Sequence, residues 1–171
     1  MIQDNDILLK KGKIIADSSS IIYLEKIDLL ETYSDFKNIL IPEPIFNELN
    51  SQKGSTDYSL YLKIIGSIKT PIQNIDNSNL LKYPDITLID YYNSLNSDGI
   101  LTDDGKVCKY CRDNNIPYIN APMVILSLKL CNIIDLDVFY DKLDEVYKLG
   151  RYSKHVRDYL NNIIKEQILN V

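Results

Sequence analysis

KIIADSSSIIYLEKIDLL, residues 13–30, passes from a short apolar run through an aspartate and three serines to apolar residues at helical spacing. We expect a buried strand over residues 13–17, because the run is short, rich in isoleucine and ended by polar serines. The spacing of the apolar residues that follow predicts one amphipathic helix through Leu30, with Ser18 or Ser19 as its N-cap. Asp17 then lies at the carboxyl end of the strand.

The same alternation of strand and helix continues along the chain. Further strands are predicted over residues 38–41, 70–72, 99–102 and 116–119. Further helices are predicted around Glu48 and over residues 58–68, 85–95, 103–115, 121–134, 138–149 and 153–168. Strands that alternate with helices through short connections predict a parallel sheet with helices on both faces. The fold class we expect is α/β: a three-layer α/β/α domain around a central, mainly parallel sheet. We expect an N-terminal extension over residues 1–12, the α/β domain over 13–134 and a C-terminal helical tail packed on it over 135–171.

Composition fits one folded domain. The chain has 171 residues, of which 45% are hydrophobic and 25% charged, as in average soluble proteins. Its net charge of −5 argues against a protein that coats nucleic acid, but not against an enzyme whose acidic site holds cations. The apolar runs are too interrupted to span a bilayer, and residues 1–13 do not resemble a secretory signal, so we expect a cytoplasmic protein without membrane contact.

Three cysteines, Cys108, Cys111 and Cys131, form no disulfide framework. Cys108 and Cys111 have C-x-x-C spacing, but no second ligand pair follows, and the single histidine, His155, is far along the chain. Because positions i and i+3 share a helix face, we expect these thiols to pack as small apolar side chains. His155 receives no catalytic role.

Acidic residues follow the predicted strands. Asp17 ends the first strand, and Asp103 and Asp104 follow the strand over residues 99–102. Functional residues of parallel α/β sheets gather beyond the carboxyl ends of strands, so these acids meet if both strands are central. Glu48 lies on the helix after the second strand, and Asp85 opens the helix before the 99–102 strand. The sequence therefore predicts one cleft with several carboxylates.

Carboxylates brought together raise one another's pKa, and a hard divalent cation such as Mg²⁺ or Mn²⁺ removes that cost. Such sites cleave phosphodiesters without a side-chain nucleophile, which suits this chain. Each acid also has a purely structural explanation. Asp17, Asp103 and Asp104 precede helices and are suited to capping them. Glu48 is suited to a solvated helix face, and Asp85 to the negative charge that a helix N-terminus favours.

The order of three segments is the specific signal: IIADSSSIIYLEKIDLL, then NILIPEPIFNELN, then DGILTDDGKVCKYCRDNNIPYINAPMVILSLKLCNII. Together they resemble a PIN domain, the nuclease fold of VapC-type toxins and RNA-processing factors. The first segment is similar to the strand-end aspartate of that family, the second to its glutamate helix, and the third to its T-D-D step. The closing helices are similar to the tail of a PIN-like subgroup of bacterial and archaeal proteins.

The resemblance implies a ribonuclease that depends on Mg²⁺ or Mn²⁺ and cleaves single-stranded RNA or structured RNA loops. It implies catalytic and metal-binding roles for a set of five acids: Asp17, Glu48, Asp85, Asp103 and Asp104. Asp90, on the same helix as Asp85, competes for the place of the third acid. Family members are commonly homodimers, and a small antitoxin protein blocks the site of toxin members. We expect Ser19, Thr102 and Lys106 to contact the RNA, since Lys106 follows the T-D-D step by a single turn.

Two other functions stay open. A catalytically silent PIN-fold module would bind RNA or a protein partner without cleaving either, and the acidic charge leaves room for it. A phosphotransfer or dehalogenase-like α/β protein is disfavoured, because Asp17 is followed by Ser18-Ser19-Ser20 and lacks the second aspartate that dehalogenase-type phosphatases place two residues later.

Overall fold

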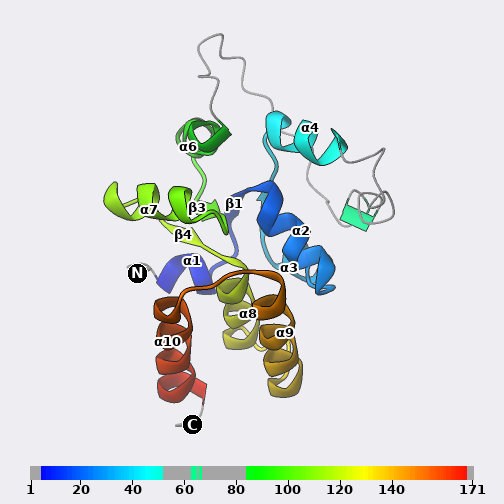
Figure 1. The fold of residues 1–171 in the computed structure, drawn as a ribbon, viewed down its shortest axis with the longest axis vertical. Helices are drawn as coiled ribbons and strands as arrows, with labels where there is room; N and C mark the ends of the chain where they lie inside the picture. The colour runs from blue at the N-terminus through cyan, green and yellow to red at the C-terminus, as the bar shows by residue number, and fades with distance from the viewer. Residues whose placement is uncertain (1–4, 52–62, 65, 67–83, 169–171) are drawn as a thin grey trace.

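A four-stranded parallel sheet forms the centre of the molecule (Figure 1). The computed structural model describes residues 5–51, 63–64, 66 and 84–168. Its strands are β1 (Lys13–Ala16), β2 (Asn38–Leu40), β3 (Gly99–Leu101) and β4 (Tyr118–Ile119), in the order β2-β1-β3-β4. In the register, Ile15 of β1 lies between Leu40 of β2 and Ile100 of β3. The expected parallel sheet is confirmed, while the strand predicted over residues 70–72 lies outside the described residues.

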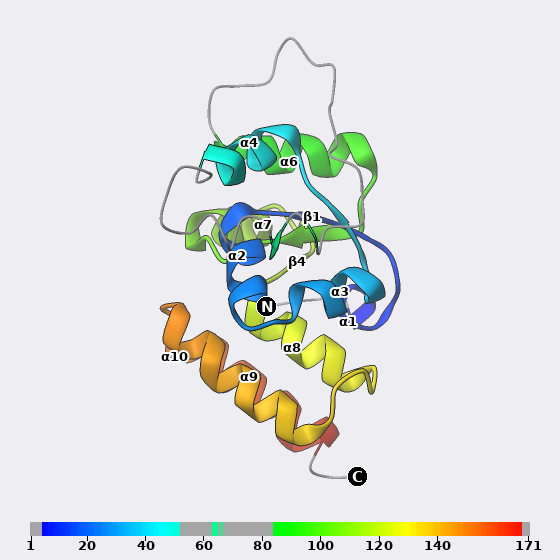
Figure 2. The same cartoon turned by 90° about the vertical axis from the view of Figure 1, so that its right-hand side faces the viewer.

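Helices cover both sides of the sheet. They are α1 (Asn5–Leu9), α2 (Ser18–Lys26), α3 (Leu30–Phe36), α4 (Glu43–Ser51), α6 (Pro84–Leu95), α7 (Gly105–Asp113), α8 (Ala121–Leu130), α9 (Leu136–Leu149), α10 (Lys154–Ile163) and a π-helical segment, η2 (Ile164–Ile168). Helices α4 and α6 lie on one side and α1, α3 and α8 on the other, with α9 and α10 beyond α8 (Figure 2). The α/β fold with helices on both sides therefore holds, and α9 packs on α8 and α2. No helix among these is long and apolar enough to cross a bilayer, as far as the described residues go.

Residues 18–36 form two helices, so the prediction of a single helix through Leu30 is wrong. Asp28 has a φ of 55°, in the left-handed region, between α2 and α3. The N–H of Leu29 donates to the carbonyl of Leu24 at 2.8 Å, and that of Asp28 to Glu25 at 3.0 Å. This pair of hydrogen bonds is the Schellman ending of a helix, and aspartate tolerates its left-handed position better than most residues. The N-cap of α2 is Asp17, not Ser18 or Ser19.

Helix α1 lies within the segment expected to be an N-terminal extension, and it belongs to the core. Ile7 and Leu8 are each 2% exposed, and the Ser127 hydroxyl of α8 donates to the carbonyl of Leu8. A Cβ added at Gly99 would overlap the Ile7 side chain and lie 2.9 Å from the carbonyl oxygen of Pro117. The glycine in β3 therefore lets α1 approach the sheet closely.

The core explains why the strands read as continuous apolar runs. Ile14, Ile15 and Ala16 of β1 are fully buried, as are Ile100 and Leu101 of β3. Strands of a parallel sheet with helices on both faces bury both sets of side chains, so apolar residues follow one another without alternation. Polar residues then begin where each central strand ends, which places them at one edge of the sheet.

Candidate active site

The two central strands bring the predicted acids together. The chain passes from β1 to β2 on one side and later returns to β3 and β4 on the other, so the order reverses between β1 and β3. Ligands of open α/β sheets bind outside the carboxyl ends of strands at such a reversal. There, the N–H of Asp17 donates to the carbonyl of Leu101 at 2.9 Å, and the hydroxyl of Thr102 donates to Asp17 Oδ2 at 3.1 Å. Asp17 and the T-D-D step are direct neighbours.

The first turn of α2 holds two carboxylates through serine hydroxyls. Ser19 Oγ donates to Asp17 Oδ2 at 3.0 Å. Ser18 Oγ lies 3.0 Å from Glu48 Oε2 and 3.4 Å from Asp17 Oδ1, and so bridges the two acids. The partly buried Asp17 is thereby fixed, while Glu48 remains exposed on α4. Because Ser19 donates a hydrogen bond to Asp17, it supports this carboxylate.

Asp103 is held by three other groups. Ser20 Oγ donates to Asp103 Oδ2 at 2.5 Å, and Tyr152 donates its hydroxyl to Oδ1 at 2.7 Å. The N–H of Ala121, at the start of α8, lies 3.2 Å from both carboxylate oxygens. Burial raises the pKa of Asp103 and the charge of Asp17 acts in the same direction, while these three hydrogen bonds oppose the rise. Asp103 is therefore a fixed carboxylate with few free lone pairs.

Asp104 caps α7 and faces the acids as well. Its Oδ1 accepts from the N–H of Lys106 at 2.6 Å, and its own N–H donates to Thr102 Oγ1 at 3.2 Å. Thr102 is 0% exposed, so the expectation that it contacts RNA is wrong: its hydroxyl orients Asp17 and the turn that carries Asp104. The side chain of Lys106 is exposed, and its contact with RNA stays a prediction.

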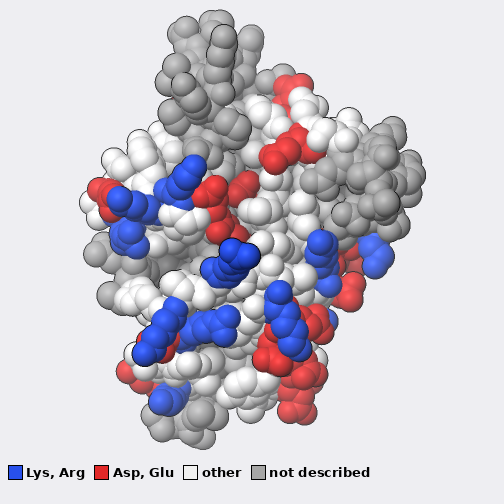
Figure 3. All heavy atoms as spheres, in the orientation of Figure 1, with Lys and Arg blue, Asp and Glu red and all other residues white. Residues whose placement is uncertain are grey.

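Three of the predicted acids share one cavity of about 210 Å³, lined by Asp17, Glu48 and Asp104 together with Ser18, Ser19, Ile45, Leu88 and Val107. We call it the acidic cavity. Asp103 does not line it and borders a second cavity instead. Figure 3 shows acidic atoms gathered near the middle of one face, with basic groups beside them. Asp103 and Asp104 are adjacent in the chain but line different cavities.

The third acid of the family pattern is not located. Asp85 lies in α6, but its side chain is outside the described residues. Asp90, the competing candidate, is partly buried on α6 and is not among the described residues that line the acidic cavity. Leu88 is the residue through which α6 borders this cavity.

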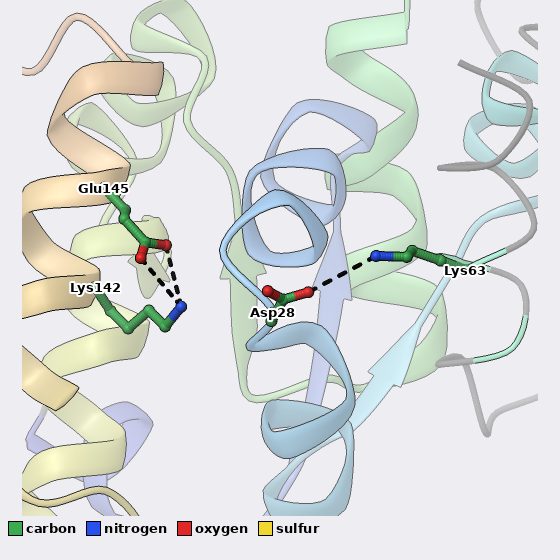
Figure 4. A network of polar contacts seen from close by, with 4 residues as sticks. All are labelled: Asp28, Lys63, Lys142 and Glu145. Atoms are coloured by element: carbon green, nitrogen blue, oxygen red, sulfur yellow. Dashed lines mark hydrogen bonds and ion pairs between the residues drawn. The ribbon is translucent and has the colours of Figure 1, made fainter.

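No lysine or arginine is among the described residues that line the acidic cavity. The ion pairs between described residues lie elsewhere: Lys63–Asp28, Lys142–Glu145, Lys148–Asp144 and Arg112–Asp113. Figure 4 shows the first two of these pairs. The oxygen donors that line the acidic cavity, carboxylates and hydroxyls, are those that Mg²⁺ and Mn²⁺ prefer. Within the described residues, no three Asp, Glu, His or Cys side chains stand close enough to hold one ion. The donor set thus fits a hard cation that keeps several of its waters.

The cysteines pack as small apolar side chains. All three are free, and Cys111 is fully buried on α7. Cys108 Sγ lies 3.5 Å from the carbonyl oxygen of Thr102. Burial raises the pKa of Cys108 to about 12 and that of Cys111 to about 11. Both thiols therefore stay protonated at neutral pH, as expected for packing residues.

The order of strands, the reversal between β1 and β3 and the acids at that reversal point to one family, and a comparison with protein-family models agrees. The model of a PIN domain matches residues 13–167. The protein belongs to the PIN-domain family. The matched region also covers α9 and α10. PIN domains are generally nucleases, and this chain has a nuclease-type fold. No curated protein matches the chain.

Two residues of the site were missed from sequence. Ser20 follows Ser18 and Ser19 in the first turn of α2, and the serine triplet was a signal that hydroxyls gather beside Asp17. Tyr152 carried no local signal, because its hydroxyl reaches Asp103 from a connection 49 residues further along the chain.

Proposed function

We propose that this PIN domain is a metal-dependent endoribonuclease that cleaves single-stranded RNA at the acidic cavity. The observation that carries the proposal is the convergence of Asp17, Glu48 and Asp104 on one cavity at the β1/β3 reversal, whose described lining contains no lysine or arginine. A cluster of this kind is costly unless a cation binds it. The toxin role, the antitoxin partner and the homodimer stay predictions from the resemblance.

Asp17, Glu48 and Asp104 would hold Mg²⁺ or Mn²⁺. When bound, such a metal supplies Lewis acidity toward a phosphate and an activated water at neutral pH. The protein's own residues prepare the carboxylates: Ser18 and Thr102 hold Asp17 from two sides, and Ser18 ties it to Glu48. Asp103 stiffens the turn before Asp104 through its contacts with α2 and α8.

A silent RNA-binding module is the second candidate, and one observation favours it. The acidic cavity does not bring three ligating side chains within reach of a single ion in the described part of the chain. Such a module would keep the hydrogen-bonded carboxylates for their structural role alone. The two candidates differ in whether RNA is cut.

The test is the variant Asp17→Asn, assayed with a fluorescent single-stranded RNA in Mg²⁺, Mn²⁺ or EDTA. Cleavage by the wild type should need the metal and fall at least 100-fold in Asp17→Asn, because replacing even a supporting group of a metal site costs about 10–100-fold. The matched control is Asp28→Asn, on an exposed turn where asparagine suits the positive φ. Full cleavage by Asp17→Asn would overturn the mechanism. A wild type that binds RNA but never cuts it would establish the second candidate.

A further inference from the structure

A second cavity, of about 280 Å³, lies between α7 and the connection from α9 to α10. Asp103 borders this second cavity, and the cavity has no part in the proposed metal site. Its lining combines basic and aromatic side chains from four places in the chain: Lys109, Arg112, Tyr118, Arg151, His155 and Tyr159. We call it the basic cavity.

The basic cavity is positively charged in a protein with a net charge of −5. The chain has three arginines, and two of them, Arg112 and Arg151, line it. Arg112 forms a loose, exposed ion pair with Asp113 at 3.9 Å, and such pairs contribute little. Its guanidinium also interacts with Tyr118, another residue of the lining. Arg151 forms no ion pair with any residue that the structure describes. Asp103, the acid among the described lining residues, already accepts from Ser20, Tyr152 and Ala121.

Size and aromatic content favour a nucleotide as the ligand. Tyr118, Tyr152 and Tyr159 are half-buried in the lining. Guanidinium groups bind phosphate through paired hydrogen bonds, and tyrosine rings stack on unpaired bases without regard to their identity. A volume of about 280 Å³ is at the small end of ligand pockets, which start near ~300 Å³, and suits one nucleotide better than a folded protein segment.

The two cavities flank one step of the chain, because Asp103 lines the basic cavity and Asp104 the acidic one. We propose that the basic cavity binds one nucleotide of the RNA strand beside the cleavage site, with Arg112 and Arg151 on its phosphate and its base against Tyr159. The identity of the ligand as RNA rests on the proposed function. The binding itself does not require the metal or the cleavage step.

The experiment measures the binding of a fluorescein-labelled single-stranded RNA of twelve nucleotides by anisotropy, in EDTA and at several KCl concentrations. Arg112→Gln and Arg151→Gln should each weaken binding about ten-fold and reduce the slope of log K against log[salt] by about 1, as the loss of one phosphate contact does. The matched control is Arg157→Gln: Arg157 lies 4.5 Å over the Tyr147 ring, is not among the residues that line the basic cavity, and should change affinity less than two-fold.

A second variant tests the base. Tyr159→Leu keeps an apolar side chain but removes the ring, and it should weaken binding about five-fold or more, because base stacking on an aromatic ring is lost. Tyr159→Leu and the wild type should bind an RNA that has an abasic site at every position with equal affinity, because such an RNA has no base to stack on the ring.

Failure of the inference and failure of the proposed function give different results. In EDTA the wild type should bind the RNA without cutting it, so cleavage can be absent while the basic cavity still binds. Equal affinities for Arg112→Gln, Arg151→Gln and Arg157→Gln would overturn the inference. So would a wild type that binds poly-glutamate but no RNA, since that cavity would then serve an acidic protein segment.

Discussion

The hydroxyl of Tyr152 donates a hydrogen bond to Asp103 Oδ1 at 2.7 Å and so joins the C-terminal helices to the end of strand β3. Tyr152 lies in the connection between α9 and α10. Burial and the charge of Asp103 both raise the pKa of Tyr152, so it stays a donor throughout the neutral range. The C-terminal helices are therefore part of the site, and their removal would leave Asp103 without one of its partners.

Tyr152→Phe removes only this hydroxyl. We expect the free energy of unfolding to fall by about 1–2 kcal/mol, since the loss leaves a carboxylate oxygen short of a donor. RNA cleavage should fall about ten-fold in kcat with little change in KM, because Asp103 positions the turn that carries Asp104. Steady-state kinetics and thermal unfolding check both. The control is Tyr140→Phe, whose ring is exposed on α9 and which should leave both values unchanged.

Thr102→Val keeps the shape of a buried side chain and deletes its hydroxyl. The change takes one donor from Asp17 and leaves the N–H of Asp104 without its acceptor, which should cost about 1–3 kcal/mol. It should also weaken Mn²⁺ binding about ten-fold, as the loss of a supporting group does. Manganese titrations followed by melting temperature measure this, because a ligand that binds only the native state raises stability with its concentration. The same Mn²⁺ affinity in Thr102→Val and the wild type would refute the supporting role of Thr102.

The cysteines provide a prediction of pH dependence. The pKa of Cys108 is about 12 in the native protein against about 9 when exposed, so its thiolate fraction at pH 8 is about a thousandth of that of an exposed thiol. Iodoacetamide should label Cys108 far more slowly in the native protein than in urea, as mass spectrometry will show. The native state retains a proton that the unfolded chain loses, so stability should fall as pH rises from about 9 toward 12. Rapid native labelling of Cys108 at pH 8 would contradict this.

Gly99→Ala tests the packing of α1 on the sheet. The added methyl would meet Ile7 and the carbonyl of Pro117, and overpacking of this kind costs about 1–3 kcal/mol. The double variant Gly99→Ala with Ile7→Val should recover part of that loss, because the shorter side chain makes room. Denaturant unfolding provides the measurement, and additive effects of the two changes would show that Ile7 is not the obstacle. Gly105→Ala is the control, as no atom lies within 4 Å of the added Cβ.

The placement of Asp17 beside Thr102 was predictable from the chain. Both residues end apolar runs that alternate with helical segments, and parallel strands present their carboxyl ends at one edge. That Asp103 and Asp104 line different cavities was not predictable in this way. Consecutive residues beyond a strand point in different directions, and only the positions of α2, α8 and Tyr152 decide which cavity each one meets.

The helix endings show a second limit of periodicity. Asp28, Asn96, Asn115 and Asn132 all have positive φ values, and each follows a helix. Aspartate and asparagine are the non-glycine residues that tolerate this conformation, so they were available as stop signals. At Asp28 the apolar spacing continues across the break into α3, and periodicity alone therefore merged two helices into one. The sequence of α1 is likewise too short to reveal that Ile7 and Leu8 reach the core.

The serine triplet has one more consequence, for the handling of the purified protein. Hydroxyl groups orient Asp17, Glu48 and Asp103 but carry no charge to offset theirs. In a chelating buffer of low ionic strength, Asp17 and Glu48 repel each other, and neither forms an ion pair with a residue that the structure describes. Monovalent salt shields partly solvated charges of this kind, so moderate salt should make the metal-free protein easier to store than dilute buffer does.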